Sequence, residues 1–134
     1  MTLFNDLGFP PALLPAILKA VGDSGYSETT AIQAAAIPAI LQHRDVLACS
    51  QTGSGKTAAF ALPLLALLAN RQANPQRKRS VAALVLVPTR ELAVQVGAVL
   101  VGFGKYVPQP AKVAVVFTSC ADVFCDGKSR YGSG

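Results

Sequence analysis

Ser50-Gln51-Thr52-Gly53-Ser54-Gly55-Lys56-Thr57 is the segment from which the fold of this chain is most directly inferred. It follows the short apolar run Val46-Leu47-Ala48 and precedes a helix-compatible run that begins at Ala58. A strand, a glycine-bearing turn and a helix in this order form a concave loop, because glycines let successive backbone N–H groups converge. The positive end of the helix dipole acts at the same place. We therefore expect residues 50–57 to bind phosphate.

The side chains of this loop have separate expected roles. Lys56 would reach the terminal phosphates as a point charge, and the Thr57 hydroxyl would bind a Mg²⁺ ion that also holds phosphate oxygens. The usual pattern is G-x-x-x-x-G-K-[ST], and Ser50 stands where this pattern has its first glycine. The alternative is a glycine-rich turn with a surface lysine, but Gly-Lys-Thr between a strand and a helix favours the phosphate loop.

The composition indicates one small domain. The chain has 134 residues, with 12 Lys and Arg against 7 Asp and Glu, a net charge of +5. This mild excess suits nucleic acid or phosphate ligands without requiring them. Hydrophobic residues make up 51% and charged residues 14%, which is apolar for a small soluble domain. Either the chain associates with a membrane, or part of the partner surface that would cover its apolar residues is missing.

The membrane alternative has little support in the sequence. The longest apolar run, 58–69, is too short to span a bilayer and contains Pro63. The N-terminus has no basic segment followed by an apolar one, so no secretory signal is visible. The three cysteines lack metal-ligand spacing, which indicates reduced cytosolic thiols. Of these, Cys49 follows an apolar run and is expected to be buried.

Apolar residues at helical spacing predict four helices. They occupy about 15–21, 31–42, 58–68 and 90–103. Thr29 or Thr30 is expected to cap the second helix, and Thr89 the fourth. Pro38 and Pro63 are expected to kink or divide the helices that contain them.

Apolar runs predict three strands, at 46–48, 81–87 and 112–117, and the two longer runs are expected to be buried. Strands that alternate with helices form a parallel sheet with right-handed crossovers, whose ligands bind at the carboxyl ends of the strands. The basic segment 70–80 is either a solvated connection or an RNA contact, and the solvated connection is favoured. Residues 118–134 show no period.

Three further features accompany the phosphate loop. They are Gly25-Tyr26-Ser27-Glu28-Thr29-Thr30-Ala31-Ile32-Gln33, the pair Ile37-Pro38 with Arg44-Asp45-Val46-Leu47, and Pro88-Thr89-Arg90-Glu91-Leu92-Ala93. Together these motifs resemble the first half of the amino-terminal RecA-like domain of a DEAD-box ATP-dependent RNA helicase, and are most similar to the bacterial RhlE type. The resemblance runs from Phe4 to Phe117.

The resemblance implies an α/β fold: a P-loop RecA-like parallel sheet with flanking helices, of which about the first half is present. It divides the chain into a helical Q-motif region (1–42), a partial RecA-like ATP-binding domain (43–117) and an irregular tail that does not match the family (118–134).

ATP and Mg²⁺ are the cofactors that the resemblance implies. Gln33 matches the glutamine of the Q motif, whose carboxamide pairs with N6–H and N7 of adenine and selects ATP over GTP. Phe4 resembles an upstream aromatic residue that packs near the base, with core packing as the alternative. The implied ATP-binding residues are Phe4, Tyr26, Gln33, Ser50, Gln51, Thr52, Gly53, Ser54, Gly55, Lys56 and Thr57, with Thr57 also on Mg²⁺.

RNA is the implied partner. Pro88, Thr89, Arg90 and Glu91 match the family motif that touches the RNA backbone, and Arg90 and N–H groups at a helix start are suitable phosphate partners. Such contacts carry no sequence information, and an ordinary first helical turn is the alternative. The full-length protein is implied to be cytoplasmic, with ribonucleoprotein or RNA-decay partners.

Departures from the family pattern limit the expected activity. Thr29 and Ala31 stand where the family usually has prolines. Hydrolysis needs a carboxylate on Mg²⁺ and a group that positions water, which Asp-Glu-Ala-Asp supplies in this family. The 7 acidic residues include no adjacent pair, so no catalytic residue is identified and Lys56 and Thr57 support only phosphate and Mg²⁺.

We therefore expect a truncated helicase that binds ATP and RNA at most and does not hydrolyse ATP alone. A non-catalytic nucleotide- or RNA-binding module is one alternative. Another P-loop enzyme, such as a kinase, is a second alternative, and Gln33 discriminates it from a helicase because only the helicase is expected to prefer ATP to GTP.

Overall fold

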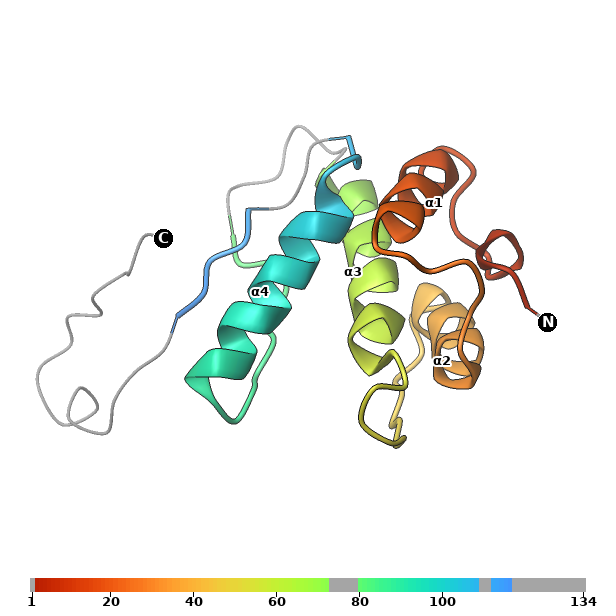
Figure 1. Cartoon of the computed structure of the whole chain (residues 1–134). Helices are drawn as coiled ribbons and strands as arrows, with labels where there is room; N and C mark the ends of the chain where they lie inside the picture. Colours follow the sequence, from red (N-terminus) through yellow and green to blue (C-terminus); the bar gives the residue numbers. More distant parts are fainter. Residues whose placement is uncertain (1, 73–79, 109–111, 117–134) are drawn as a thin grey trace, which may run out of the picture.

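Among the described residues, four α-helices and a short 3-10 helix pack into one helical layer (Figure 1). The computed structural model describes residues 2–72, 80–108 and 112–116. The elements are η1 (Phe4–Asp6), α1 (Leu14–Asp23), α2 (Ala31–Leu41), α3 (Lys56–Gln72) and α4 (Arg90–Gly104). α3 lies between α2 and α4 and packs against both, and α1 packs against α4 and η1. The first residues of α3 and α4 lie at the same end of this helical layer (Figure 1).

The predicted cap of α2 is confirmed at Thr30. Its side chain accepts a hydrogen bond from the Gln33 backbone N–H at 3.5 Å, and the Gln33 Oε1 accepts one from the Thr30 N–H at 3.0 Å. The two bonds form a capping box, which satisfies two donors that a helix start leaves unpaired. The helix then runs through Pro38 without a break, so the expected division at this proline is wrong. Loss of one backbone hydrogen bond is tolerated in a helix that is packed against α3.

α3 is longer than its sequence pattern predicts. It continues through Pro63 and past Leu68 to Gln72, as one uninterrupted helix. Ala61 and Leu62 are fully buried directly before the proline. Burial of this helix face stabilises the helix by tertiary packing, which outweighs the local effect of the proline.

One hydrophobic core lies between the helices. Its members come from η1, from all four α-helices and from the turns between them. The buried apolar residues with the least exposure include Leu7, Ile17, Val21, Ile37, Ala61 and Leu62. Within the described residues, no helix is long and apolar enough to cross a membrane.

The three predicted strands are not formed in the part of the chain that the structure describes. Residues 46–48, 81–87 and 112–116 carry no strand assignment there. Most of their large apolar side chains are exposed instead, with exposed fractions of 101% for Leu47, 77% for Leu84 and 83% for Leu86. The prediction of burial on both faces is therefore wrong for the two longer segments. A strand needs a neighbouring strand for its backbone hydrogen bonds, whereas a helix bonds within itself.

The segment 112–116 nevertheless keeps one face on the helical layer. Val113 and Val115 are half-buried, whereas Ala114 and Val116 are exposed, the alternation expected for an extended chain. A Cβ atom at Gly97 of α4 would lie 2.6 Å from the Val115 Cγ2. The absence of a side chain at Gly97 therefore lets this segment approach α4 closely. Phe117 and the predicted tail 118–134 lie outside the described residues.

Candidate nucleotide-binding site

The predicted phosphate loop is a tight turn that leads directly into α3. Gly53 and Gly55 have φ angles of 80° and 83°, which L-residues rarely adopt and glycine adopts without penalty. The Ser54 N–H donates to the Gln51 carbonyl at 3.3 Å, and the first backbone bond of α3 joins the Ala59 N–H to the Gly55 carbonyl at 3.0 Å. The loop is thus held in a turn at the positive end of a helix dipole.

Side chains of the loop form hydrogen bonds to other residues of the same loop. The Lys56 Nζ donates to the Ser50 carbonyl at 2.5 Å, and the Ser50 and Ser54 hydroxyl oxygens are 2.5 Å apart. Gln51, Thr52 and Lys56 are exposed to solvent. The loop therefore presents an ammonium group and a helix N-terminus to solvent on one short segment, a combination that suits phosphate.

Gln33 lies against this loop and has no exposed surface. Its Nε2 donates to the Gly55 carbonyl at 3.3 Å, and its Oε1 accepts from the Thr30 N–H. The structure thus brings the predicted base-reading residue together with the phosphate loop. In this arrangement the carboxamide joins the start of α2 to the start of α3, and its pairing with adenine stays a prediction.

Two observations explain why position 55 requires glycine: its φ angle and its close contact with Gln33. A Cβ atom at this position would lie 2.4 Å from the Gln33 Nε2 and 3.3 Å from the Thr30 Oγ1. No such contact exists at Gly53, where nothing lies within 4 Å of a Cβ. A residue with a side chain at position 55 would therefore require the Gln33 carboxamide to move.

The structural partners of Gln33 were not predicted from the sequence as parts of the site. Thr30 was expected only as a helix cap, and the Gly55 carbonyl was not expected to accept a side-chain hydrogen bond. The spacing Thr30-x-x-Gln33 is a capping-box pattern, which could have indicated the first contact. No sequence signal indicates the second contact, because 22 positions separate Gln33 from Gly55.

Phe4 and Tyr26 have different positions relative to the predicted site. Phe4 is 3% exposed and belongs to the hydrophobic core, which favours core packing, the alternative considered for it. It still contributes to a cavity of 280 Å³ that Tyr26 also lines. Tyr26 is half-buried and also lines a second cavity, of 380 Å³, together with Thr57. The Tyr26 ring thus lies between the two cavities.

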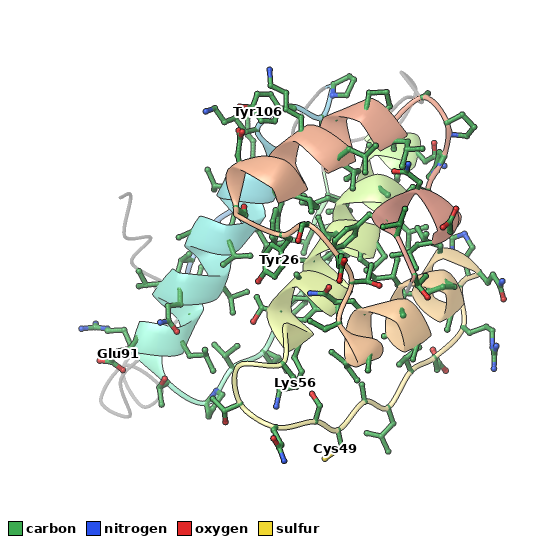
Figure 2. The ribbon with its side chains drawn as sticks, turned by 45° about the vertical axis from the view of Figure 1, so that its right-hand side comes forward. Tyr26, Cys49, Lys56, Glu91 and Tyr106 are labelled. Atoms are coloured by element: carbon green, nitrogen blue, oxygen red, sulfur yellow. The ribbon has the colours of Figure 1, made fainter. Side chains whose placement is uncertain are left out.

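The predicted RNA-contact motif lies at the start of α4. The Thr89 side chain accepts from the Leu92 N–H at 3.2 Å and caps the helix, as predicted. Pro88, Arg90 and Glu91 are exposed around this cap. Figure 2 shows Lys56 and Glu91 toward the same end of the molecule, with Tyr106 at the opposite end. The helix starts that carry the two predicted phosphate contacts therefore face the same side.

The residues of the phosphate loop and the start of α3 fit the phosphates of a nucleoside triphosphate. The donors are the Lys56 ammonium group and the N–H groups at the start of α3, and the glycine conformations leave room for them to converge. Mg²⁺ prefers oxygen ligands, and Thr57 offers a hydroxyl in this place. Among the described residues, no group of three or more His, Cys, Asp or Glu side chains could hold a metal ion. Mg²⁺ would therefore be held largely through the nucleotide.

Cys49 is exposed, although the apolar run before it in the sequence predicts that it is buried. It is an exposed free thiol directly before the loop (Figure 2). The reason is the one that applies to Leu47: the segment 46–48 has no neighbouring strands to cover it.

Comparisons with known proteins agree with this site. A family model described as DEAD/DEAH box helicase matches residues 30–123. The ATP-dependent RNA helicase DeaD of Mycobacterium tuberculosis (strain ATCC 25618 / H37Rv) is 50% identical over 95 residues, which cover 71% of this chain and 16% of that protein. The ATP-dependent RNA helicase DDX55 of Gallus gallus is 40% identical over 107 residues, which cover 80% of this chain and 18% of that protein. The chain thus spans less than a fifth of the length of these relatives.

Two solved structures are similar in fold. The RNA helicase Prp28 from Chaetomium thermophilum bound to ADP matches with a TM-score of 0.70 and 36% identity, over 92% of this chain and 28% of that one. A DEAD box protein from Methanococcus jannaschii matches with a TM-score of 0.62 and 35% identity, over 77% of this chain and 26% of that one. The predicted fold class, part of a RecA-like domain, is confirmed by these similarities, although the described residues contain only its helices.

Proposed function

The chain belongs to the DEAD/DEAH box helicase family, and we propose that it forms the ATP-binding part of the first RecA-like domain of an ATP-dependent RNA helicase. In the whole protein, ATP binding and hydrolysis would drive the unwinding or remodelling of RNA duplexes. The relatives named above are RNA helicases by description, and Prp28 was solved with ADP, which supports this function.

The observation that carries the proposal is the junction of the phosphate loop with Gln33. Lys56 begins α3 at the end of a turn with two glycines of positive φ. The Gln33 side chain is hydrogen-bonded to the last of these glycines. A generic glycine-rich turn does not need a buried carboxamide from another helix at this point.

Several finer assignments complete the proposal. Mg²⁺ would be bound by the Thr57 hydroxyl and by phosphate oxygens of the nucleotide. The RNA backbone would be contacted, without sequence preference, by Pro88, Thr89, Arg90 and Glu91. The RhlE type, a cytoplasmic location and ribonucleoprotein or RNA-decay partners are further proposals. The relatives described as DeaD, DDX55 and RhpA span several types of RNA helicase, so they support the family rather than one type.

We also propose that this chain alone does not turn ATP over. Hydrolysis requires a carboxylate on Mg²⁺ and a group that positions the attacking water. Among the described residues, no group of three or more His, Cys, Asp or Glu side chains could hold a metal ion, and the acidic residues of the sequence include no adjacent pair. The expected activity of the isolated chain is therefore binding without cleavage.

Binding of a fluorescent ATP analogue, with unlabelled ATP and GTP as competitors, tests the proposal. Lys56→Ala removes a charged hydrogen-bond donor to phosphate, and we expect it to weaken binding about tenfold or more. Lys112→Ala, which removes an exposed lysine outside the loop, serves as the matched control with unchanged affinity. RNA-stimulated phosphate release is measured in parallel and is expected to be absent.

The outcomes separate the alternatives. Equal competition by GTP and ATP would favour another P-loop enzyme over a helicase. Salt-dependent RNA binding that is indifferent to ATP and to Lys56→Ala would favour a simple RNA-binding module. Phosphate release that Lys56→Ala abolishes would contradict the inactivity of the isolated chain.

A further inference from the structure

A cluster of polar contacts joins the end of α1 to the end of α4. The Tyr106 hydroxyl donates to the Asp23 Oδ2 at 2.5 Å, across 83 positions of sequence. The Lys19 Nζ lies 4.3 Å from the centre of the Tyr106 ring, and the Lys105 Nζ lies 5.3 Å from it. Asp23 is the last residue of α1, where the helix dipole disfavours a carboxylate. Its contact with Tyr106 offsets this local disadvantage.

The turn that follows Asp23 is closed by backbone hydrogen bonds and leads to Tyr26. Gly25 has a φ angle of 80°, and the Tyr26 N–H donates to the Val21 carbonyl at 3.1 Å. The Tyr26 ring packs on Phe103 of α4, with ring centres 6.4 Å apart. The Phe103 ring of α4 thus contacts Tyr26 in this turn, and the Tyr106 hydroxyl, two residues after α4, binds Asp23 directly before the turn.

This turn forms one wall of the cavity that contains Thr57. The cavity of 380 Å³ is lined by Ser24 and Tyr26 from the turn, Thr57 and Ala58 from α3, and the middle of α4. Figure 2 shows Tyr26 between Tyr106, at one end of the molecule, and Lys56, at the other. A shift of the turn relative to α4 would thus move the Tyr26 ring relative to the start of α3.

We propose that Tyr106 is a positioning residue for the nucleotide site. Through its hydrogen bond to Asp23, it holds the turn 24–26 against α4, so that Tyr26 keeps its place between the cavity at Phe4 and the cavity at Thr57. The inference rests on the proposed ATP binding. It assigns to Tyr106 an effect on the nucleoside part of ATP, because the phosphate loop has its own hydrogen bonds and makes none to this turn in the described residues.

Affinities of the full chain for ATP and for inorganic tripolyphosphate test this proposal. Tyr106→Phe removes the hydroxyl and keeps the ring between the two lysines. We expect it to weaken ATP binding about threefold to tenfold, the effect of one lost hydrogen bond, and to leave tripolyphosphate binding unchanged. A defect in folding would weaken both ligands, so the difference between them reports positioning.

Variants at Asp23 provide the second line of the test. Asp23→Ala removes the acceptor and should weaken ATP binding as Tyr106→Phe does, whereas Asp23→Asn keeps an acceptor oxygen and should restore most of the affinity. The double variant Tyr106→Phe, Asp23→Ala should be no weaker than either single variant, because both remove one interaction.

Three results would overturn the proposal. Unchanged ATP affinity in both Tyr106→Phe and Asp23→Ala would refute it while leaving the proposed function intact. Equal losses of ATP and tripolyphosphate would show a general structural effect instead. An unmodified chain that binds neither ligand would refute the proposed function, and this inference with it.

Discussion

Replacement of Gly55 by alanine provides the sharpest test of how the phosphate loop is held. Gly55 has a φ angle of 83°, and a Cβ there would lie 2.4 Å from the Gln33 Nε2. The left-handed conformation alone costs an alanine about 1–2 kcal/mol. The Gln33 carboxamide must also move, which breaks its bond to the Gly55 carbonyl and leaves a buried amide unpaired, at a cost of about 1–3 kcal/mol. Gly55→Ala should therefore lower the free energy of unfolding by about 2–5 kcal/mol.

Gly53→Ala is the matched control for this substitution. Gly53 has nearly the same φ angle, 80°, but nothing lies within 4 Å of a Cβ at that position. Only the conformational cost applies, so the expected loss is about 1–2 kcal/mol. The difference between the two variants measures the contacts that a Cβ at position 55 makes with Gln33 and Thr30.

Urea denaturation at low protein concentration, followed by far-UV circular dichroism, gives the free energies. A third variant completes the experiment: in a Gln33→Ala background the obstacle to the Cβ is absent, so Gly55→Ala should then cost no more than Gly53→Ala. The coupling between Gln33 and Gly55 is expected to be about 1–3 kcal/mol. Equal losses for Gly55→Ala and Gly53→Ala in the unmodified chain, or additive effects with Gln33→Ala, would refute the reasoning.

Three further predictions concern the helices and the extended segments. His43, two residues after the end of α2, has a φ angle of 59°, so His43→Gly should raise the free energy of unfolding by about 0.5–1 kcal/mol in the same urea assay. Gly102→Ala in α4 should raise the free energy of unfolding by about 0.5–1 kcal/mol, since nothing lies within 4 Å of a Cβ at that position. Gly97→Ala should instead lower the free energy of unfolding, because its Cβ would meet a methyl group of Val115 at 2.6 Å. Replacement of Leu84 and Leu86, 77% and 83% exposed, by serine should reduce self-association in sedimentation velocity.

Each of these predictions has a result that contradicts it. A gain in stability from His43→Ala equal to that from His43→Gly would show that the left-handed conformation is not the cause. Equal effects of alanine at Gly97 and Gly102 would mean that the segment 112–116 does not pack on α4 as described. A sharp cooperative melt and a monomeric sedimentation profile of the unmodified chain would show that the exposed leucines do not drive association.

Local features of this protein could be predicted from the sequence. The caps at Thr30 and Thr89, the start of α1 near Pro15 and the end of α4 near Phe103 all lie where the spacing of residue types indicates. The turn at Gly53 and Gly55 also follows from the sequence. These features depend on hydrogen bonds and backbone angles within a few residues, so neighbouring side chains contain the necessary information.

Features that depend on distant parts of the chain could not be predicted in the same way. The apolar runs at 46–48, 81–87 and 112–116 have the composition of buried strands, but a strand forms only beside another strand. Pro38 and Pro63 indicate helix breaks, yet the helices continue through them because packing against other helices outweighs the local cost. In both cases the deciding interaction lies outside the segment.

The phosphate loop illustrates the division between sequence and tertiary structure. The glycine-bearing turn at 50–57 and the helix after it could be read from the sequence, because φ preferences and helix hydrogen bonds are local. The helix begins at Lys56, two residues before its predicted start. Only the tertiary structure decided that Gln33 lies buried against Gly55 and that Phe4 belongs to the core. Those positions depend on which surfaces meet when α2, α3 and η1 pack, and no pattern within one segment specifies its partner across space.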